Sequence, residues 1–246
     1  MTDTRMEWLD VDLFSHTEPP RIPWVVENFA AIGQVTMLVG DPGVGKSWVA
    51  LNAAAEAAVG KPFLDMHTNV RSCVVIDAEN GPNEMHRRLK ALQFFDHLQV
   101  ADVSNFNFEE SLYMIEDACT PADCGLLILD SMRTIWAGDE NDSKAVTTCL
   151  SRLQQMARSS ETAVVVIHHT NKMGTFRGSG ALQAVPEIMV TCNRLKRDKI
   201  ASRFYMKWEK LRSAPRPSTK WAMLEKGVVL PAHRPTDDEL WPKHGE

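Results

Sequence analysis

Short apolar runs alternate along this chain with longer stretches of helix-forming residues. Runs rich in β-branched residues have the length of buried strands and lie at 34–39, 72–77, 125–130 and 162–168. A weaker run of this kind lies near 97–103. The intervening stretches favour helices near 47–59, 82–95, 108–119 and 142–159. This order predicts βαβ units, and therefore an α/β fold with a central, mostly parallel, twisted sheet flanked by helices.

The pattern changes after residue 186. Strand-like segments there follow one another with only short turns between them, at 187–193, 202–211, 219–224 and 227–231. Strands that are not separated by helices predict an antiparallel extension at one edge of the sheet.

The two ends of the chain differ from this central region. Residues 1–33 are proline-rich and predict an extended lead-in that packs on the outside of the sheet, with Trp24 as its anchor. Residues 232–246 are rich in Pro, His and charge and predict a loose tail. We therefore expect one domain over 34–231 between two appendages.

Composition limits the class of protein. With 246 residues, 44% hydrophobic and 24% charged, the chain suits one large globular domain. No apolar stretch is long enough to span a bilayer, and the first residues lack the apolar core of a secretion signal. The cysteines are scattered without metal-ligand spacing, which favours buried thiols in a reducing compartment. We therefore expect a cytoplasmic protein with no membrane partner.

The net charge of −5 argues against a protein coated with positive charge for nucleic acid. The distribution is uneven, because the segment 194–220 holds ten Lys and Arg, opposed only by Asp198 and Glu209. A local basic face is therefore compatible with the acidic total.

Residues 40–47 read Gly-Asp-Pro-Gly-Val-Gly-Lys-Ser and match the phosphate-binding pattern Gly-x4-Gly-Lys-Ser/Thr in full. The glycines let backbone N–H groups converge on phosphate oxygens, Lys46 can reach the β- and γ-phosphates, and the Ser47 hydroxyl can ligate Mg²⁺. The order strand, glycine loop, helix supports the match, and Gly60 ends the helix. The predicted ATP-binding residues are Gly40, Asp41, Pro42, Gly43, Val44, Gly45, Lys46, Ser47 and Trp48.

Polar residues at the carboxyl ends of other predicted strands supply the remaining parts of a hydrolytic site. Asp130 ends the run at 125–130 and is a second candidate partner for Mg²⁺. Glu79 follows the run at 72–77 and is the candidate general base, with Asp77 as a structural carboxylate.

His168 and His169 end the next strand, where one of them can sense the γ-phosphate; the sequence does not say which. The following segment, 169–180, is Gly-rich, basic and without apolar periodicity. It carries Lys172, Phe176 and Arg177, cations with an aromatic residue that suit contact with single-stranded nucleic acid. A solvated loop without a ligand explains the same residues equally well.

Together these motifs resemble the RecA-like P-loop ATPases, in particular the plasmid RepA-type replicative helicases and the related DnaB-type ring proteins. The resemblance covers roughly residues 20–225. Residues 76–80 resemble the segment that carries the catalytic glutamate, 129–134 the metal-binding segment, and 168–172 the sensor strand. Arg88 lies on the helix after Glu79, where RepA-type sequences also carry an arginine.

Lys210-Leu211-Arg212 resembles the Lys-x-Arg element of DnaB-like rings, whose two cations enter the neighbouring subunit's active site. Two cations at the rim of an antiparallel strand are the alternative interpretation. The resemblance implies catalytic roles for Lys210 and Arg212, and hence a homo-oligomer, a hexameric ring in that family.

The resemblance implies an ATP- and Mg²⁺-dependent motor on single-stranded DNA, a ring-forming replicative helicase or translocase of a plasmid or phage-like element. Because RecA-like cores serve several tasks, two alternatives stay open. One is a recombination or strand-annealing ATPase, and the other is a non-motor, ATP-dependent regulator associated with DNA.

Overall fold

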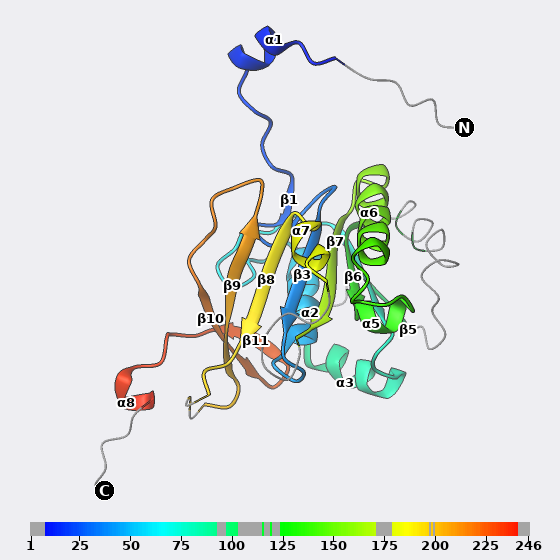
Figure 1. Ribbon diagram of the computed structural model, residues 1–246. Coiled ribbons are helices and arrows are strands. Elements are labelled where there is room, and N and C mark those ends of the chain that lie inside the picture. Colours follow the sequence, from blue (N-terminus) through cyan, green and yellow to red (C-terminus); the bar gives the residue numbers. More distant parts are fainter. Residues whose placement is uncertain are drawn as a thin grey trace, which may run out of the picture.

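The computed structural model describes residues 8–92, 97–102, 115, 119, 124–170, 179–196, 198 and 200–240. Within these residues a nine-stranded sheet has the order β11-β10-β9-β8-β3-β7-β6-β4-β5 (Figure 1). The expected α/β architecture, with a mostly parallel sheet and antiparallel strands at the C-terminal side, is confirmed.

Six neighbouring strands of the sheet are parallel. They are β3 (Val35–Gly40), β4 (Ser72–Asp77), β5 (Leu98–Asp102), β6 (Cys124–Asp130), β7 (Ala163–His169) and β8 (Ile188–Asn193). Parallel pairing brings their carboxyl ends to one edge, where Gly40 lies opposite His169 and Asp77 opposite Asp130. This edge therefore collects the polar residues that end the strands.

The antiparallel part comprises β9 (Arg203–Leu211), β10 (Lys220–Glu225) and β11 (Val228–Pro231). The prediction was wrong for β8, which pairs parallel with β3 and antiparallel only with β9. After β7 the chain returns, through α7 (Ala181–Ala184), to the end of the sheet at which the parallel strands begin. β8 therefore starts beside the start of β3.

Helices cover both faces of the sheet. On one face α2 (Lys46–Val59) packs its alanines against β4 and β6, and α3 (Pro82–Leu92) follows β4. On the other face lie α6 (Ser143–Ser159) and the short α5 (Met132–Ile135). Most of the helix expected near 108–119 lies outside the described residues. The five cysteines all lie among the described residues and are buried, as expected, and none of them forms a disulfide.

The lead-in before the sheet has two parts. A small hairpin of β1 (Trp24–Val26) and β2 (Ala30–Ala31) is anchored by Val25, Val26 and Phe29, which are fully buried, whereas Trp24 is only half-buried. Residues 8–22, with α1 (Val11–His16), do not pack on the sheet as expected but stand apart from it (Figure 1). None of the described helices has the length and apolarity needed to cross a membrane.

The segment after β11 is held in place as far as Leu240, contrary to the expectation of a loose tail. Arg203, at the start of β9 and 1% exposed, pairs with Asp198 (Nε–Oδ2 3.0 Å) and with Glu239 (Nη2–Oε1 2.9 Å). Glu239 belongs to α8 (Asp237–Leu240). A buried guanidinium needs such partners, and the sequence carries no local pattern that reveals a partner 36 residues away.

Candidate nucleotide site

The glycine loop joins β3 to α2 at the carboxyl edge of the sheet. Gly43 and Gly45 have φ of +76° and +111°, a region that residues with a Cβ rarely adopt. A Cβ on Gly40 would collide with the carbonyl oxygen of Cys192 on β8. The backbone therefore takes the form of a phosphate cradle only because these positions lack side chains.

Lys46 lies in this cradle and is 3% exposed. Its ammonium donates to the carbonyls of Gly40 (2.9 Å) and Asp41 (3.0 Å) and to Nδ1 of His169 (3.1 Å). Burial lowers the pKa of Lys46, and the nearby carboxylates, Asp130 and Glu79 among them, oppose that shift.

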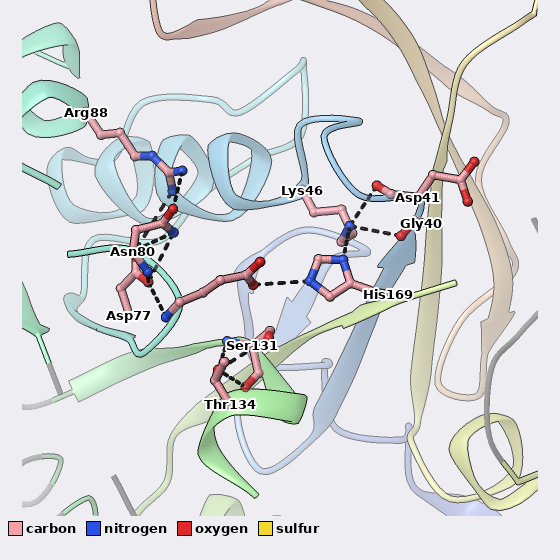
Figure 2. A network of polar contacts seen from close by, with 10 residues as sticks. Gly40, Asp41, Lys46, Asp77, Asn80, Arg88, Ser131, Thr134 and His169 are labelled. Carbon is pink, nitrogen blue, oxygen red and sulfur yellow. Dashed lines mark hydrogen bonds and ion pairs between the residues drawn. The ribbon is translucent and has the colours of Figure 1, made fainter. Parts of the chain in front are cut away.

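His169 connects Lys46 to Glu79, and Figure 2 shows its contact with Lys46. Its Nε2 lies 3.1 Å from Oε2 of Glu79. Because the ammonium of Lys46 can only donate, Nδ1 must accept, and Nε2 then carries the hydrogen that Glu79 accepts. The contacts thus select one neutral tautomer of His169 between the phosphate-binding lysine and the candidate base.

His168 points to the other face of the sheet, because successive residues of a strand alternate. It is 3% exposed and lines a separate cavity of about 280 Å³ with Trp136 and Asn141. The structure thus separates the two histidines that the sequence left equivalent, and it brings only His169 to the glycine loop. Next in the chain, the Thr170 hydroxyl hydrogen bonds the carboxylate of Asp41.

Asp130 ends β6 beneath the glycine loop and is 3% exposed. Burial raises its pKa to about 6, although a hydrogen bond from Ser47 acts in the opposite direction. Its Oδ1 is buried and has no hydrogen-bond partner among the described residues. A buried carboxylate oxygen beside a serine hydroxyl is a donor set that suits Mg²⁺, so the residues present fit the expected ion.

Asp77 shapes the turn that carries Glu79. One of its oxygens accepts from the backbone N–H groups of Glu79 (2.9 Å) and Asn80 (2.8 Å). The Asn80 side chain also bonds Asp77 and accepts from Arg88 (3.2 Å) (Figure 2). Asp77 is therefore occupied in holding the turn, and Glu79 is the carboxylate left at the loop edge.

A cavity of about 310 Å³ runs from the glycine loop between these groups and contains residues that the strand-end pattern did not supply. Arg88, on α3, lines it, and its guanidinium stacks 5.5 Å from the ring centre of Trp48. Asn80 and Leu224, the latter from β10, complete the wall. The helical periodicity after Glu79 could have predicted that Arg88 faces the turn at Glu79. The position of Leu224 could not be predicted in this way, because it depends on how β10 pairs with β9, far along the chain.

Lys210 and Arg212 lie beside the amino-terminal ends of the parallel strands, whereas the glycine loop lies at their carboxyl ends. Leu211 pairs with Ile188, which pairs with Thr36 near the start of β3. At about 3.3 Å per residue, this places them roughly 15 Å along the strands from the loop. Lys210 donates to the carbonyls of Gln183 (2.9 Å) and Ala184 (2.6 Å), and Arg212 to Ala184 (2.7 Å), at the end of α7.

These two cations therefore take no part in the site of their own chain. The expected DNA-contacting residues Lys172, Phe176 and Arg177 lie outside the described residues. At the end of that loop, the backbone N–H of Ser179 bonds the carbonyl of Glu140, in the segment that follows α5.

The sheet order, the glycine loop and the carboxylates at its edge define the ATPase core of a RecA-like P-loop protein. The chain belongs to the AAA domain family, whose model matches residues 2–175. It is similar to proteins named DNA repair protein RadA. The similarity is 26% identity over 156 residues for that of Halalkalibacterium halodurans and 24% over 172 for that of Listeria monocytogenes.

These matches cover 61% and 68% of this chain but only 31% and 34% of the relatives, so the chain spans about a third of their length. Among solved structures it is similar to one described as the ATPase domain of G40P. The TM-score is 0.64 at 15% identity, over 81% of this chain and 85% of the other. At this identity the likeness establishes the fold alone.

Proposed function

We propose that this chain hydrolyses ATP as a RecA-like motor on single-stranded DNA, within a ring of identical copies. The observation that carries the proposal is the hydrogen-bonded series Lys46–His169–Glu79 beside Ser47 and Asp130. In the proposed site this series would combine a phosphate grip, a contact that the γ-phosphate would replace, and a carboxylate that would activate water.

ATP would take its place by displacing the internal partners of Lys46. The ammonium now bonded to two loop carbonyls and His169 would turn to the β- and γ-phosphates. Lys46 would thereby release Nδ1 of His169, which keeps its contact with Glu79 through Nε2. Loss of the γ-phosphate would restore the present contacts, which is the behaviour of a sensor.

Ser47 and Asp130 would hold Mg²⁺, which when bound neutralises charge on the phosphates. Glu79 would accept the proton of the attacking water, with the Asp77–Asn80–Arg88 contacts keeping its turn in position. Trp48 and Leu224, which line the same cavity, would take the nucleoside.

Lys210 and Arg212 would complete the site of a neighbouring copy. Their position far from their own glycine loop supports this role, because only a second chain can bring them to a triphosphate. Cations supplied in trans stabilise the charge of the transition state and link hydrolysis to movement between subunits. The full task would be that of a replicative helicase or translocase of a plasmid or phage-like element.

A recombination or annealing ATPase is the second candidate, and the RadA relatives favour it because they are named DNA repair proteins. It would share the hydrolytic site and single-stranded DNA but would not unwind a fork. A non-motor regulator would hydrolyse slowly, without stimulation by DNA.

The test is the ATPase rate of the wild type with and without single-stranded DNA, beside Lys46→Ala and Glu79→Gln. The proposal expects stimulation by DNA, and turnover lost in both variants while circular dichroism stays unchanged. Normal turnover in both variants would contradict the hydrolytic site. A DNA-independent rate would contradict the motor, and a forked-duplex assay separates the helicase from the annealing protein.

A further inference from the structure

Asn52 is a buried amide on α2 to which the proposed hydrolysis assigns no role. It is 2% exposed. Its Nδ2 donates to the carbonyls of Trp48 (2.8 Å) and Gly227 (3.1 Å), and its Oδ1 accepts from the backbone N–H of Val229 (3.0 Å). Two of these three hydrogen bonds reach a segment 175 and 177 residues further along the chain. The amide therefore joins the helix of the glycine loop to the hairpin formed by β10 and β11.

The register of this hairpin connects Asn52 to the nucleotide cavity. Only Lys226 and Gly227 separate the two strands, and both have positive φ, of 49° and 88°, as a tight two-residue turn between antiparallel strands requires. Val229, whose N–H bonds Asn52, pairs directly with Leu224 on β10. Leu224 lines the cavity at the glycine loop. Asn52 therefore fixes the position directly opposite a residue of the cavity wall.

The turn of the hairpin also packs against Trp48, the second candidate contact for the nucleoside. A Cβ on Gly227 would lie 2.9 Å from two atoms of the six-membered ring of Trp48 and 2.5 Å from Cβ of Ala91 on α3. The guanidinium of Arg88, also on α3, lies 5.5 Å from the ring centre of Trp48. The indole thus contacts both the hairpin and α3, and its place in the cavity depends on where the hairpin lies.

We propose that Asn52 is a positioning residue for the nucleoside of the bound triphosphate. Its hydrogen bonds hold the hairpin that sets Leu224 and Trp48, whereas Lys46 is held by the carbonyls of the loop and by β7. The inference rests on the proposed function, because it takes the cavity at the glycine loop as the nucleotide site. It adds that separate contacts fix the nucleoside and the phosphates, so that one can be weakened without the other.

The test compares the binding of two ligands to the wild type and to Asn52→Leu. Leucine has nearly the size of asparagine but forms none of the three hydrogen bonds. Calorimetric titration with Mg²⁺ measures the Kd for a non-hydrolysable ATP analogue, which carries a nucleoside, and for inorganic tripolyphosphate, which carries none. The Kd for the analogue should rise about tenfold, the effect of losing one well-made contact. The Kd for tripolyphosphate should change by less than about twofold, because the contacts of the glycine loop remain.

Thr162→Val is the matched control. Thr162 is fully buried just before β7, and its hydroxyl lies 2.8 Å from the carbonyl of Cys124 and 3.1 Å from that of Ser160. Losing these bonds, at the end of the strands away from the glycine loop, should lower the thermal midpoint and leave both Kd values unchanged. Asn52→Ser, whose hydroxyl bonds only within its own helix and does not reach the hairpin, gives the same test if the leucine variant does not fold.

An equal rise of both Kd values in Asn52→Leu would overturn the inference, because it would assign Asn52 to the stability of the fold as a whole. Unchanged binding of the analogue would overturn it too, and so would a wild type that binds tripolyphosphate as tightly as the analogue. Lys46→Ala, which should weaken both ligands, and phosphate release by the wild type are measured in parallel. They report on the hydrolytic site whatever the result for Asn52, so failure of the inference is distinct from failure of the proposed function.

Discussion

Asp130 is the residue at which burial and charge conflict most. Its carboxylate is almost fully enclosed, and one oxygen has no partner among the described residues. Its pKa of about 6 lies above the value of about 4 for an unfolded chain, so folding favours the protonated form. Ionisation therefore costs stability as the pH rises from about 4 through 6, by roughly 3 kcal/mol at most.

Asp130→Asn removes this cost. The variant should be more stable than the wild type at pH 8 without Mg²⁺, by an amount on the order of 2 kcal/mol, and equal to it at pH 4. Urea unfolding at both pH values measures the difference. The same variant should lose the Mg²⁺ dependence of nucleotide binding. A variant less stable than the wild type at pH 8 would contradict the stability cost of burying this charge.

His169→Ala tests the histidine that the geometry selects. Removing the contact between Lys46 and Glu79 should lower kcat by about 10²-fold, since a positioned polar group acts on the chemical step. The Kd for a non-hydrolysable analogue should change less than threefold, because Lys46 keeps its loop. His86→Ala, an exposed change on α3, is the control. A full loss of binding would contradict the sensor role.

The gathering of candidate site residues at the carboxyl ends of the strands was predictable where a pattern and its context agree. The pattern at 40–47, with the strand-end residues Glu79 and Asp130, needed only the rule that parallel strands end at one edge. His168 and His169 could not be separated, because only the pairing of β7 with β3 decides which of two alternating side chains meets Lys46.

At the scale of elements, β8 and the glycine loop constrain each other. The Cβ of an alanine at position 40 would meet the backbone carbonyl of Cys192, which cannot move aside. A Cβ at Gly43 has nothing within 4 Å, and only the positive φ opposes it. The motif thus requires glycine at position 40 because the strands pack closely there, and at position 43 because the backbone has a positive φ.

Gly40→Ala should therefore damage the fold more than Gly43→Ala. The strained φ at Gly43 costs about 1 kcal/mol, which is on the order of 3 °C in the thermal midpoint for a domain of this size. Gly40→Ala should lower the midpoint by at least twice as much, because β3 and β8 must separate. Calorimetry of both variants measures this, and equal midpoints would contradict the close approach of the strands.

The contact of Arg203 with α8 makes the segment after β11 part of the fold. Glu239→Gln should lower the thermal midpoint, because it leaves a buried guanidinium with one carboxylate fewer. Glu225→Gln, an exposed change at the end of β10, is the matched control. An unchanged midpoint in Glu239→Gln would mean that α8 is not held by this pair.

Strands and helices followed from periodicity, but the direction of β8 did not. Adjacent strand patterns suggest hairpins, and the return of the chain through α7 has no strong local signal in four helical residues. The partners of Arg203 could not be predicted either, because an ion pair between distant segments produces no periodic pattern in the sequence.

At the scale of the whole molecule, the nucleotide site and the candidate trans cations lie at opposite edges of one sheet. Within a single copy, the glycine loop therefore lies far from Lys210 and Arg212, and these two cations lie far from any bound triphosphate. The central claim is that two copies share each hydrolytic site.

Mixing two inactive variants tests this claim most directly. Glu79→Gln keeps Lys210 and Arg212 but lacks the base, whereas Lys210→Ala/Arg212→Ala keeps the base but lacks the cations. In an equal mixture of randomly assembled copies, about a quarter of the interfaces join an intact site to intact cations. We expect each variant alone to be inactive and the mixture to recover about a quarter of the wild-type ATPase rate. A cation variant that is active alone, or a mixture that stays inactive, would contradict the shared site.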